Sequence, residues 1–319
     1  MSPDTRSTAQ FPAETSTDGA FVRQRYRFRD RITADGSSGY KAEPGRYHLY
    51  VSLACPWAHR TIIVRRLLGL EDTISMSVVD PIRDEKGWAF REGRGHTDDP
   101  VCGFAYLSEA YLRSDPTFTG RVTVPCIWDR VTERIVTNNY PDITIDFETE
   151  FTAFHRAGAR DLYPAALRPE IDEINALVYE NVNNGVYRAG FSTTQAKYEE
   201  AVIALFARLD WLEARLATRR YLVGELLTEA DIRLFTTLVR FDAVYVGHFK
   251  CNLRRLVDYE HLWRYARDLY QQPGFGDTVD FDHIKRHYYM THDHLNPSRN
   301  VPLGPLVEWP SPIGNARTS

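Results

Sequence analysis

One cysteine stands where an apolar, alternating segment gives way to a helical pattern. Cys55 is followed directly by Pro56, and proline is favoured at the first position of a helix, where its missing N–H costs nothing. The start of a helix presents unpaired N–H groups and the positive end of the helix dipole, which stabilise an anion. A thiolate is the nucleophilic form of cysteine, whereas a free thiol with a pKa of about 8.5 is mostly protonated at neutral pH. We therefore predict that Cys55 is an ionised nucleophile and not an inert buried thiol.

The position three residues after Cys55 is occupied by Ala58. In dithiol oxidoreductases a second cysteine at that position resolves the mixed disulfide. Cys55 cannot close such a local disulfide, so an external thiol must complete each turnover. The remaining cysteines are too widely spaced for a disulfide framework or a zinc site, and we expect small, buried core residues at Cys102, Cys126 and Cys251.

A strand–turn–helix unit is needed to place Cys55, and the flanking residues predict one. Residues 47–53 alternate between apolar and other side chains, which is typical of a strand, and apolar residues then follow at helical spacing up to a stop at Gly69. Further strands are predicted at 73–79, 121–128 and 134–137. The order β-α-β followed by a hairpin predicts a thioredoxin-like half.

Two features of this half bear on a site. The connection over residues 80–119 is long and irregular, and such connections are usually functional or act as lids. The Val124-Pro125 pair, at the edge of a predicted strand, is a candidate cis peptide bond that leaves backbone groups available to a ligand. In thioredoxin-like folds this loop faces the active cysteine.

The second half of the chain has a helical pattern throughout. A strong amphipathic helix is predicted from Tyr198 to Leu216, and capping boxes are predicted at Ser192 with Gln195 and at Thr228 with Asp231. We expect an N-terminal extension at 1–40 with little structure of its own, a thioredoxin-like domain at 41–152, an all-helical domain at 161–297 and a C-terminal tail at 298–319.

Composition excludes several classes of function. The net charge of −4 and the absence of a basic stripe give no reason to expect nucleic acid as a partner. No apolar run reaches the ~18 residues of a membrane span. Residues 1–17 lack the apolar region of a secretory signal, so we expect a cytoplasmic protein that acts on small molecules and not on membranes.

The chain resembles the glutathionyl-hydroquinone reductases, also called Xi-class glutathione transferases, over residues 46–305. The resemblance implies an α/β thioredoxin-like N-terminal domain plus an all-α C-terminal domain, which is the glutathione transferase architecture, in a homodimeric enzyme. From the residues themselves we expect no metal. The segments that carry it are Cys55–Arg60 (CPWAHR), Gly120–Pro125 (GRVTVP), Asn183–Gly190 (NNGVYRAG), Leu227–Val239 (LTEADIRLFTTLV), His248–Asn252 (HFKCN) and His283–Tyr289 (HIKRHYY).

Residue roles follow from the same resemblance. It implies that Cys55 is the nucleophile, that Tyr187 is the proton donor, and that the hydroxyls of Tyr245 and Tyr288 help to stabilise the thiolate or the substrate. The implied reaction is thiol-dependent cleavage of a glutathionyl-hydroquinone thioether, with a quinone-derived aromatic as the small-molecule substrate. The implied contacts to the thiol co-substrate are Trp88 and the backbone segment Arg121, Val122, Thr123 and Val124.

One position departs from the family pattern. After the fourth strand the family has a Glu-Ser pair that binds the γ-glutamyl end of glutathione, whereas Asn139 and Tyr140 stand here. Asn139 has no charge to pair with an ammonium group, and Tyr140 is far bulkier than serine. We therefore hypothesise that the co-substrate is another low-molecular-weight thiol, with mycothiol as the candidate; compensation by Asp142 is the alternative.

Other interpretations stay open at this point. The chain could be a glutathione-conjugating transferase, although such enzymes generally hold a non-covalent thiolate with Ser or Tyr, or a non-catalytic thiol-binding or scaffold protein. His283 and His287 lie four residues apart, with His292 and His294 close behind, but no carboxylate or cysteine completes an obvious metal site. His59 could tune the thiolate or have an ordinary packing role.

Overall fold

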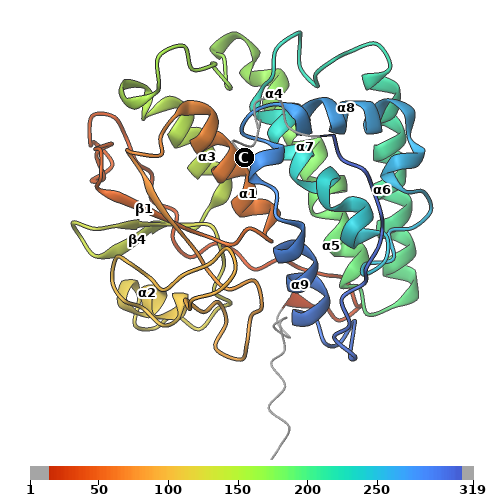
Figure 1. Cartoon of the computed structure of the whole chain (residues 1–319), viewed down its shortest axis with the longest axis horizontal. Coiled ribbons are helices and arrows are strands. Elements are labelled where there is room, and N and C mark those ends of the chain that lie inside the picture. The colour runs from red at the N-terminus through yellow and green to blue at the C-terminus, as the bar shows by residue number, and fades with distance from the viewer. Residues whose placement is uncertain (1–13, 311–319) are drawn as a thin grey trace, which may run out of the picture. The chain divides into compact units, whose positions relative to one another are not determined.

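The computed structural model describes residues 14–310, which form two compact units (Figure 1). The first unit comprises Gln24–Arg160 and Asp280–Val301, and the second comprises Asp161–Val279 together with residues 14–23 and 302–310. Residues 24–40, from the predicted N-terminal extension, and residues 280–297, from the predicted helical domain, belong to the first unit.

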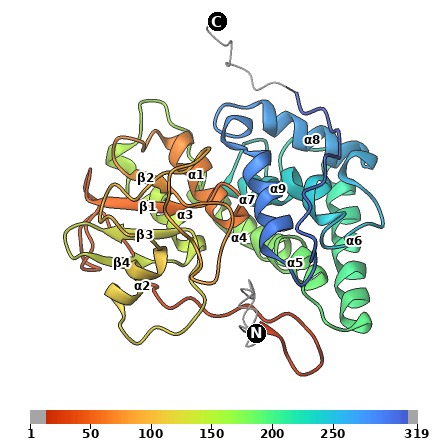
Figure 2. The same cartoon turned by 60° about the horizontal axis from the view of Figure 1, so that its bottom comes forward.

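A four-stranded mixed sheet forms the centre of the first unit. The strands are β1 (Tyr47–Val51), β2 (Ser75–Val78), β3 (Cys126–Asp129) and β4 (Arg134–Thr137), arranged in the order β2-β1-β3-β4 (Figure 2). β1 is parallel to β2, and β3 is antiparallel to both β1 and β4. This is the predicted topology of a parallel crossover followed by a hairpin.

Three helices cover this sheet, and a fourth comes from the end of the chain. α1 (Pro56–Leu68) packs beside α3 (Tyr140–Thr149) on one face, and α2 (Leu107–Ser114) lies by β4 on the other (Figure 1). α9 (Phe281–Thr291) also belongs to this unit. α1 ends at the predicted stop, where Gly69 adopts a left-handed φ of 72° and its N–H donates to a carbonyl of the last turn.

Two predictions for this unit were wrong in part. The connection at 80–119 is not irregular throughout, since it contains α2, whose eight residues are too short to give a clear periodic signal. The strand predicted at 121–128 begins only at Cys126. Residues 121–124 have an apolar alternation that favours a strand, but their backbone groups bind side chains outside the ladder, as described below.

The segment at 24–40 follows the outer edge of β4. The Asp30 N–H donates to the Val136 carbonyl over 3.2 Å, and the Asn138 N–H donates to the Phe28 carbonyl over 3.1 Å. Ile32 is almost fully buried. The segment therefore covers an edge strand that would otherwise expose unpaired backbone groups. It is tied to the first unit along its length, although it was predicted as an extension with little structure.

The second unit is helical, as predicted. Its α-helices are α4 (Arg168–Val178), α5 (Gly185–Gly190), α6 (Gln195–Leu216), α7 (Glu229–Arg240) and α8 (Glu260–Gln271), with π-helical turns at Tyr179–Asn183 and Phe241–Tyr245. The predicted apolar face of α6 is buried from Val202 to Leu216, whereas Tyr198 is only half-buried. Within residues 14–310, no helix combines the length and apolar character that crossing a membrane requires.

One predicted capping box is confirmed and the other is wrong. Thr228 is the residue that precedes α7. Its N–H donates to the Asp231 carboxylate over 2.8 Å, and the two residues form a capping box. α6 instead begins after Thr194, and the Ser192 hydroxyl donates to the Ala189 carbonyl over 2.9 Å. Ser192 is therefore part of the preceding turn, a choice that spacing between Ser and Gln cannot reveal.

Candidate active site

Cys55 is the residue that precedes the first turn of α1. Its backbone is extended, with φ −78° and ψ 121°, and Pro56 occupies the first helical position. The Cys55 carbonyl accepts the first helical hydrogen bond from the His59 N–H over 2.9 Å. The thiol thus lies at the positive end of the helix dipole, as the sequence predicted, where a thiolate is favoured over a thiol.

The residue before the cis peptide bond faces this cysteine. The bond between Val124 and Pro125 is cis, and the Cys55 Sγ lies 3.4 Å from the Val124 carbonyl oxygen. Both residues are largely buried. The predicted encounter between the two loops is therefore confirmed within the first unit.

Side chains from two distant segments hold the backbone of residues 121–124. The Gln24 side-chain amide donates to the Arg121 carbonyl over 2.5 Å, and its oxygen accepts from the Arg121 N–H over 2.8 Å. The Tyr111 hydroxyl donates to the Thr123 carbonyl over 2.7 Å. Among the described residues, the N–H groups of Val122 and Val124 have no hydrogen-bond partner, so this stretch retains donors for a ligand.

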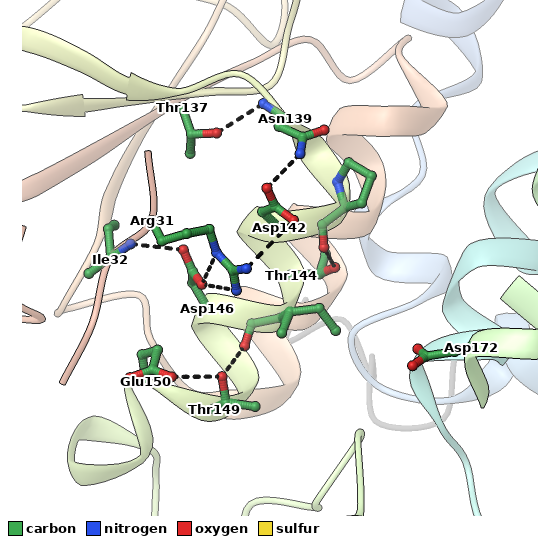
Figure 3. Close-up of polar contacts among 12 residues, drawn as sticks. Arg31, Ile32, Thr137, Asn139, Asp142, Thr144, Asp146, Thr149, Glu150 and Asp172 are labelled. Carbon is green, nitrogen blue, oxygen red and sulfur yellow. Dashed lines mark hydrogen bonds and ion pairs between the residues drawn. The ribbon is translucent and has the colours of Figure 1, made fainter. Parts of the chain in front are cut away.

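The turn before α3 is internally bonded (Figure 3). The Asn139 N–H donates to the Thr137 hydroxyl over 3.0 Å, and the Asn139 side-chain amide donates to the Asp142 carboxylate over 2.5 Å. Asn139 is nearly buried. The polar side chain at this position is therefore directed to its own helix.

The Tyr140 ring is directed toward α1. It is 2% exposed, and its centroid lies 4.7 Å from that of Trp57, with an interplanar angle of 39°. The Arg60 guanidinium carbon lies 4.9 Å from the Tyr140 ring centroid and 4.8 Å from that of Trp57. Tyr140 therefore fills space beside the helix that carries Cys55, in an aromatic and cationic contact that a serine could not make.

A cation from the segment at 24–40 neutralises the first turn of α3 (Figure 3). The Arg31 guanidinium lies 3.7 Å from an Asp142 carboxylate oxygen and binds the Asp146 carboxylate over 2.5 Å. The Ile32 N–H donates to the second oxygen of Asp146 over 3.0 Å. The Asp142 carboxylate thus already has two partners, Asn139 and Arg31.

Trp88 and Tyr288 belong to the same unit as Cys55. The Trp88 ring stacks on His287 of α9, with centroids 5.0 Å apart and an interplanar angle of 18°. The buried Tyr288 is next to His287, and their ring centroids are 5.2 Å apart. α9 therefore contacts the long connection through the predicted thiol contact Trp88.

The histidines of α9 bind backbone carbonyls. His283 Nε2 donates to the Arg94 carbonyl over 2.6 Å, and His287 Nδ1 donates to the Pro81 carbonyl over 2.7 Å. Within residues 14–310 no group of three or more His, Cys, Asp or Glu side chains is arranged to hold a metal ion. The two histidines fix the long connection at its start and middle. His59 is fully buried in α1.

Tyr187 and Tyr245 lie together in the second unit. Their ring centroids are 6.1 Å apart, both side chains are largely buried, and the Tyr245 ring stacks on Phe249 at 5.6 Å. The Arg23 guanidinium carbon lies 5.0 Å from the Tyr187 ring centroid, and its Nε donates to the Asn184 side chain over 3.0 Å. The Arg23 guanidinium therefore packs against the ring of Tyr187 and is fixed there by Asn184.

The other cysteines follow the sequence-based expectation except for one. Burial raises the pKa of Cys126 and of Cys251 well above the ordinary thiol value, so both are protonated core residues. Cys102 was expected to be buried but is only partly so, because it lies in a turn whose N–H groups bind the Asp99 carboxylate.

Sequence reasoning missed the residues that hold the site from outside it. These residues share no motif or spacing with the positions that they bind, and the only signal was a polar or aromatic side chain in an otherwise unassigned segment. They are Arg23, Gln24, Arg31 and Tyr111.

Comparison with known proteins gives concordant relatives. Residues 54–149 match the family model for the glutathione S-transferase N-terminal domain, and residues 195–268 match that for the C-terminal domain. A glutathionyl-hydroquinone reductase of Escherichia coli is 50% identical over 306 residues, which cover 94% of this chain and 93% of that protein.

Solved structures agree with the sequence relatives. The glutathione transferase Xi of Phanerochaete chrysosporium has a TM-score of 0.90 and 48% identity, covering 93% of this chain and 96% of that one. The glutathione-bound structure of the glutathione transferase homologue YqjG of E. coli has a TM-score of 0.86 and 49% identity, covering 90% and 95% of the two chains.

Proposed function

Because the chain belongs to the glutathionyl-hydroquinone reductases, the Xi class of the glutathione transferases, we propose that it cleaves hydroquinone thioethers through a mixed disulfide on Cys55. The observation that carries this proposal is the place of Cys55 at the start of α1, facing Val124, with Ala58 where a resolving cysteine would stand. We further propose that the enzyme is a homodimer, as the resemblance implies, and that it acts in the cytoplasm.

The first step breaks a carbon–sulfur bond. The Cys55 thiolate attacks the thioether sulfur and forms a disulfide with the thiol moiety of the substrate, while the bonding electron pair leaves with the aromatic carbon. That carbon takes a proton, and the Tyr187 hydroxyl is the proposed donor. The hydroquinone is released, and Cys55 carries the thiol as a mixed disulfide.

The second step regenerates the nucleophile. A second thiol, as its thiolate, attacks the co-substrate sulfur of the mixed disulfide, which frees the Cys55 thiolate and yields a disulfide of two co-substrate molecules. The net reaction consumes one thioether and one thiol. The two-electron reduction of the aromatic carbon is balanced by oxidation of the thioether sulfur and the thiol sulfur to that disulfide. The N–H groups of Val122 and Val124, which have no partner among the described residues, are the proposed anchors for the thiol that becomes attached to Cys55.

The finer proposal concerns the identity of the thiol. The family's glutamate is replaced by Asn139, and the nearby Asp142 carboxylate is bonded to Asn139 and lies 3.7 Å from Arg31. An ammonium group at this position would lack a free carboxylate, and the loss of a charge-assisted hydrogen bond costs about 1.5–3 kcal/mol. These contacts support a co-substrate without a γ-glutamyl ammonium group, and mycothiol is the candidate.

Cys55→Ser, with Cys102→Ser as the matched control, tests the proposed function. Hydroquinone conjugates of glutathione and of mycothiol are each incubated with the matching free thiol. The wild type and Cys102→Ser should release hydroquinone from at least one conjugate, and Cys55→Ser should release it from neither. Mass spectrometry of wild-type protein quenched with acid should detect the thiol attached to Cys55. A conjugating transferase would keep its conjugating activity in Cys55→Ser. A scaffold protein would show neither hydroquinone release nor a Cys55 adduct.

A further inference from the structure

We propose that Tyr111 is a positioning residue for the thiol co-substrate, acting through the backbone of residues 121–124. The inference rests on the proposed function, because that function assigns this backbone to thiol binding. Tyr111 lies on α2, a helix that no site residue belongs to, and its hydroxyl reaches the residue immediately before Val124.

The Tyr111 hydroxyl makes every hydrogen bond that a phenol can make. It donates to the Thr123 carbonyl over 2.7 Å and accepts from the Thr123 N–H over 3.2 Å and from the Asn138 side-chain amide over 3.1 Å. The side chain is fully buried. One hydroxyl therefore holds both backbone polar groups of Thr123, in a place where no strand partner does so.

Asn138 connects this hydroxyl to the segment at 24–40. Its amide nitrogen also donates to the Thr123 hydroxyl over 3.1 Å, and its amide oxygen accepts from the Phe28 N–H over 3.2 Å. Gln24 binds the other end of the stretch at Arg121. Residues 121–124 are thus held at Arg121 and at Thr123, and the intervening and following N–H groups are left for a ligand.

The consequence for the site follows from the position of Val124. Its carbonyl oxygen lies 3.4 Å from the Cys55 Sγ, directly after the residue that Tyr111 holds. If Thr123 were released, the Val124 donor would lose its fixed distance from the nucleophile. A displacement of about 1 Å would take the Val124 N–H out of hydrogen-bond range of a bound thiol, and binding of that thiol would weaken.

Tyr111→Phe tests the proposal, with Tyr47→Phe as the matched control. Tyr47 is an equally buried tyrosine of the same unit whose hydroxyl donates to the Lys41 carbonyl over 2.7 Å. We expect KM for the thiol to rise about fivefold to tenfold in Tyr111→Phe, with kcat changed by less than about twofold. Tyr47→Phe should lose comparable stability but keep both constants.

A binding measurement separates this proposal from the proposed function. Calorimetric titration of Cys55→Ser protein with glutathione and with mycothiol needs no hydroquinone chemistry. In the double variant Cys55→Ser/Tyr111→Phe, the Kd of the preferred thiol should rise by the same factor as its KM rises in Tyr111→Phe. If the wild type reduces no hydroquinone conjugate but this binding loss is seen, the proposed function fails and the positioning role stands.

A second variant covers a failure of Tyr111→Phe to fold. Gln24→Leu removes the half-buried amide that binds Arg121 and leaves Tyr111 in place, so it should also weaken thiol binding several-fold. The proposal is overturned if the folded variants bind the thiol as the wild type does. It is also overturned if Tyr47→Phe weakens thiol binding as much as Tyr111→Phe does. A wild-type protein that binds neither thiol overturns it as well.

Discussion

The Sγ atom of Cys55 lies 3.4 Å from the carbonyl oxygen of Val124, the residue that precedes the cis peptide bond. This contact joins the start of α1 to a backbone stretch that lies outside the sheet ladder. Side chains hold this stretch at Arg121 and Thr123. We infer that its remaining N–H donors bind a ligand beside Cys55.

Ala58→Cys should convert the enzyme to a dithiol form. The new thiol stands three residues after Cys55 in the first turn of α1, where it can attack a mixed disulfide on that residue. We expect mild oxidant to produce a disulfide between positions 55 and 58 and to stop hydroquinone release, with recovery after reduction. Peptide mapping and a thiol count detect the bond, and Ala58→Ser is the control. An Ala58→Cys enzyme that stays fully active and reduced in oxidant would contradict the single-thiol mechanism.

Replacement of Asn139 by Glu together with Tyr140 by Ser should shift the preference toward glutathione. The glutamate restores a charge for the γ-glutamyl ammonium group, so KM for glutathione should fall about tenfold to a hundredfold. Steady-state kinetics with glutathione and with mycothiol measure the shift.

Asp142→Asn provides the control for this exchange. Its carboxylate is bonded to Asn139 and lies near Arg31, so its removal should leave KM for glutathione within about twofold. A large rise in KM would show that Asp142 compensates for the missing glutamate. Full wild-type activity at ordinary glutathione concentrations would end the hypothesis of a different thiol.

Tyr187→Phe should slow the carbon–sulfur cleavage step. Loss of a general acid commonly costs about 10²–10⁴ in rate, whereas the phenyl ring retains the packing with Tyr245. kcat should therefore fall with little change in KM for the thioether. Phe191→Leu is a suitable control, because Phe191 contacts the Tyr187 ring at 6.0 Å but carries no proton. Equal losses in the two variants would reduce the role of Tyr187 to packing.

The stability of the first unit should fall on acidification through the titration of His48. Burial lowers the pKa of His48 from 6.5 to about 4, and both ring nitrogens bind serine hydroxyls, Ser75 over 2.7 Å and Ser77 over 2.8 Å. The folded state therefore resists protonation. The contribution of neutral His48 to the free energy of unfolding is fully present above pH 6.5. It decreases by about 3 kcal/mol as the pH falls from 6.5 toward 4.

Denaturant unfolding at a series of pH values measures this slope. His48→Asn should reduce the pH dependence between 6.5 and 4, at some cost in stability at neutral pH. An unchanged slope in the variant would assign the acid sensitivity to other groups.

Local sequence signals predicted the parts of the fold whose causes are local. The junction of strand, Cys55 and Pro56 and the stop at Gly69 depend on helix capping within a few residues, and the predicted positions are confirmed. The Thr228 cap is of the same kind, whereas the one at Ser192 is wrong because two neighbouring hydroxyl residues competed for the cap. The strand predicted at 121–128 is too long because its alternating side chains do not reveal which backbone groups have partners.

The sequence by itself determined the place of Cys55 before a helix, the absence of a cysteine three residues later and the two-part architecture, because each follows from the type and spacing of nearby residues. Only the tertiary structure decided what surrounds Cys55. Gln24 binds Arg121 across 97 positions of sequence, Arg31 lies by Asp142 across 111, and Tyr111 binds Thr123 across 12. No periodicity links such residues. Hydrogen bonds between distant segments form when the chain packs, so their partners can be identified only once the fold has brought those segments together.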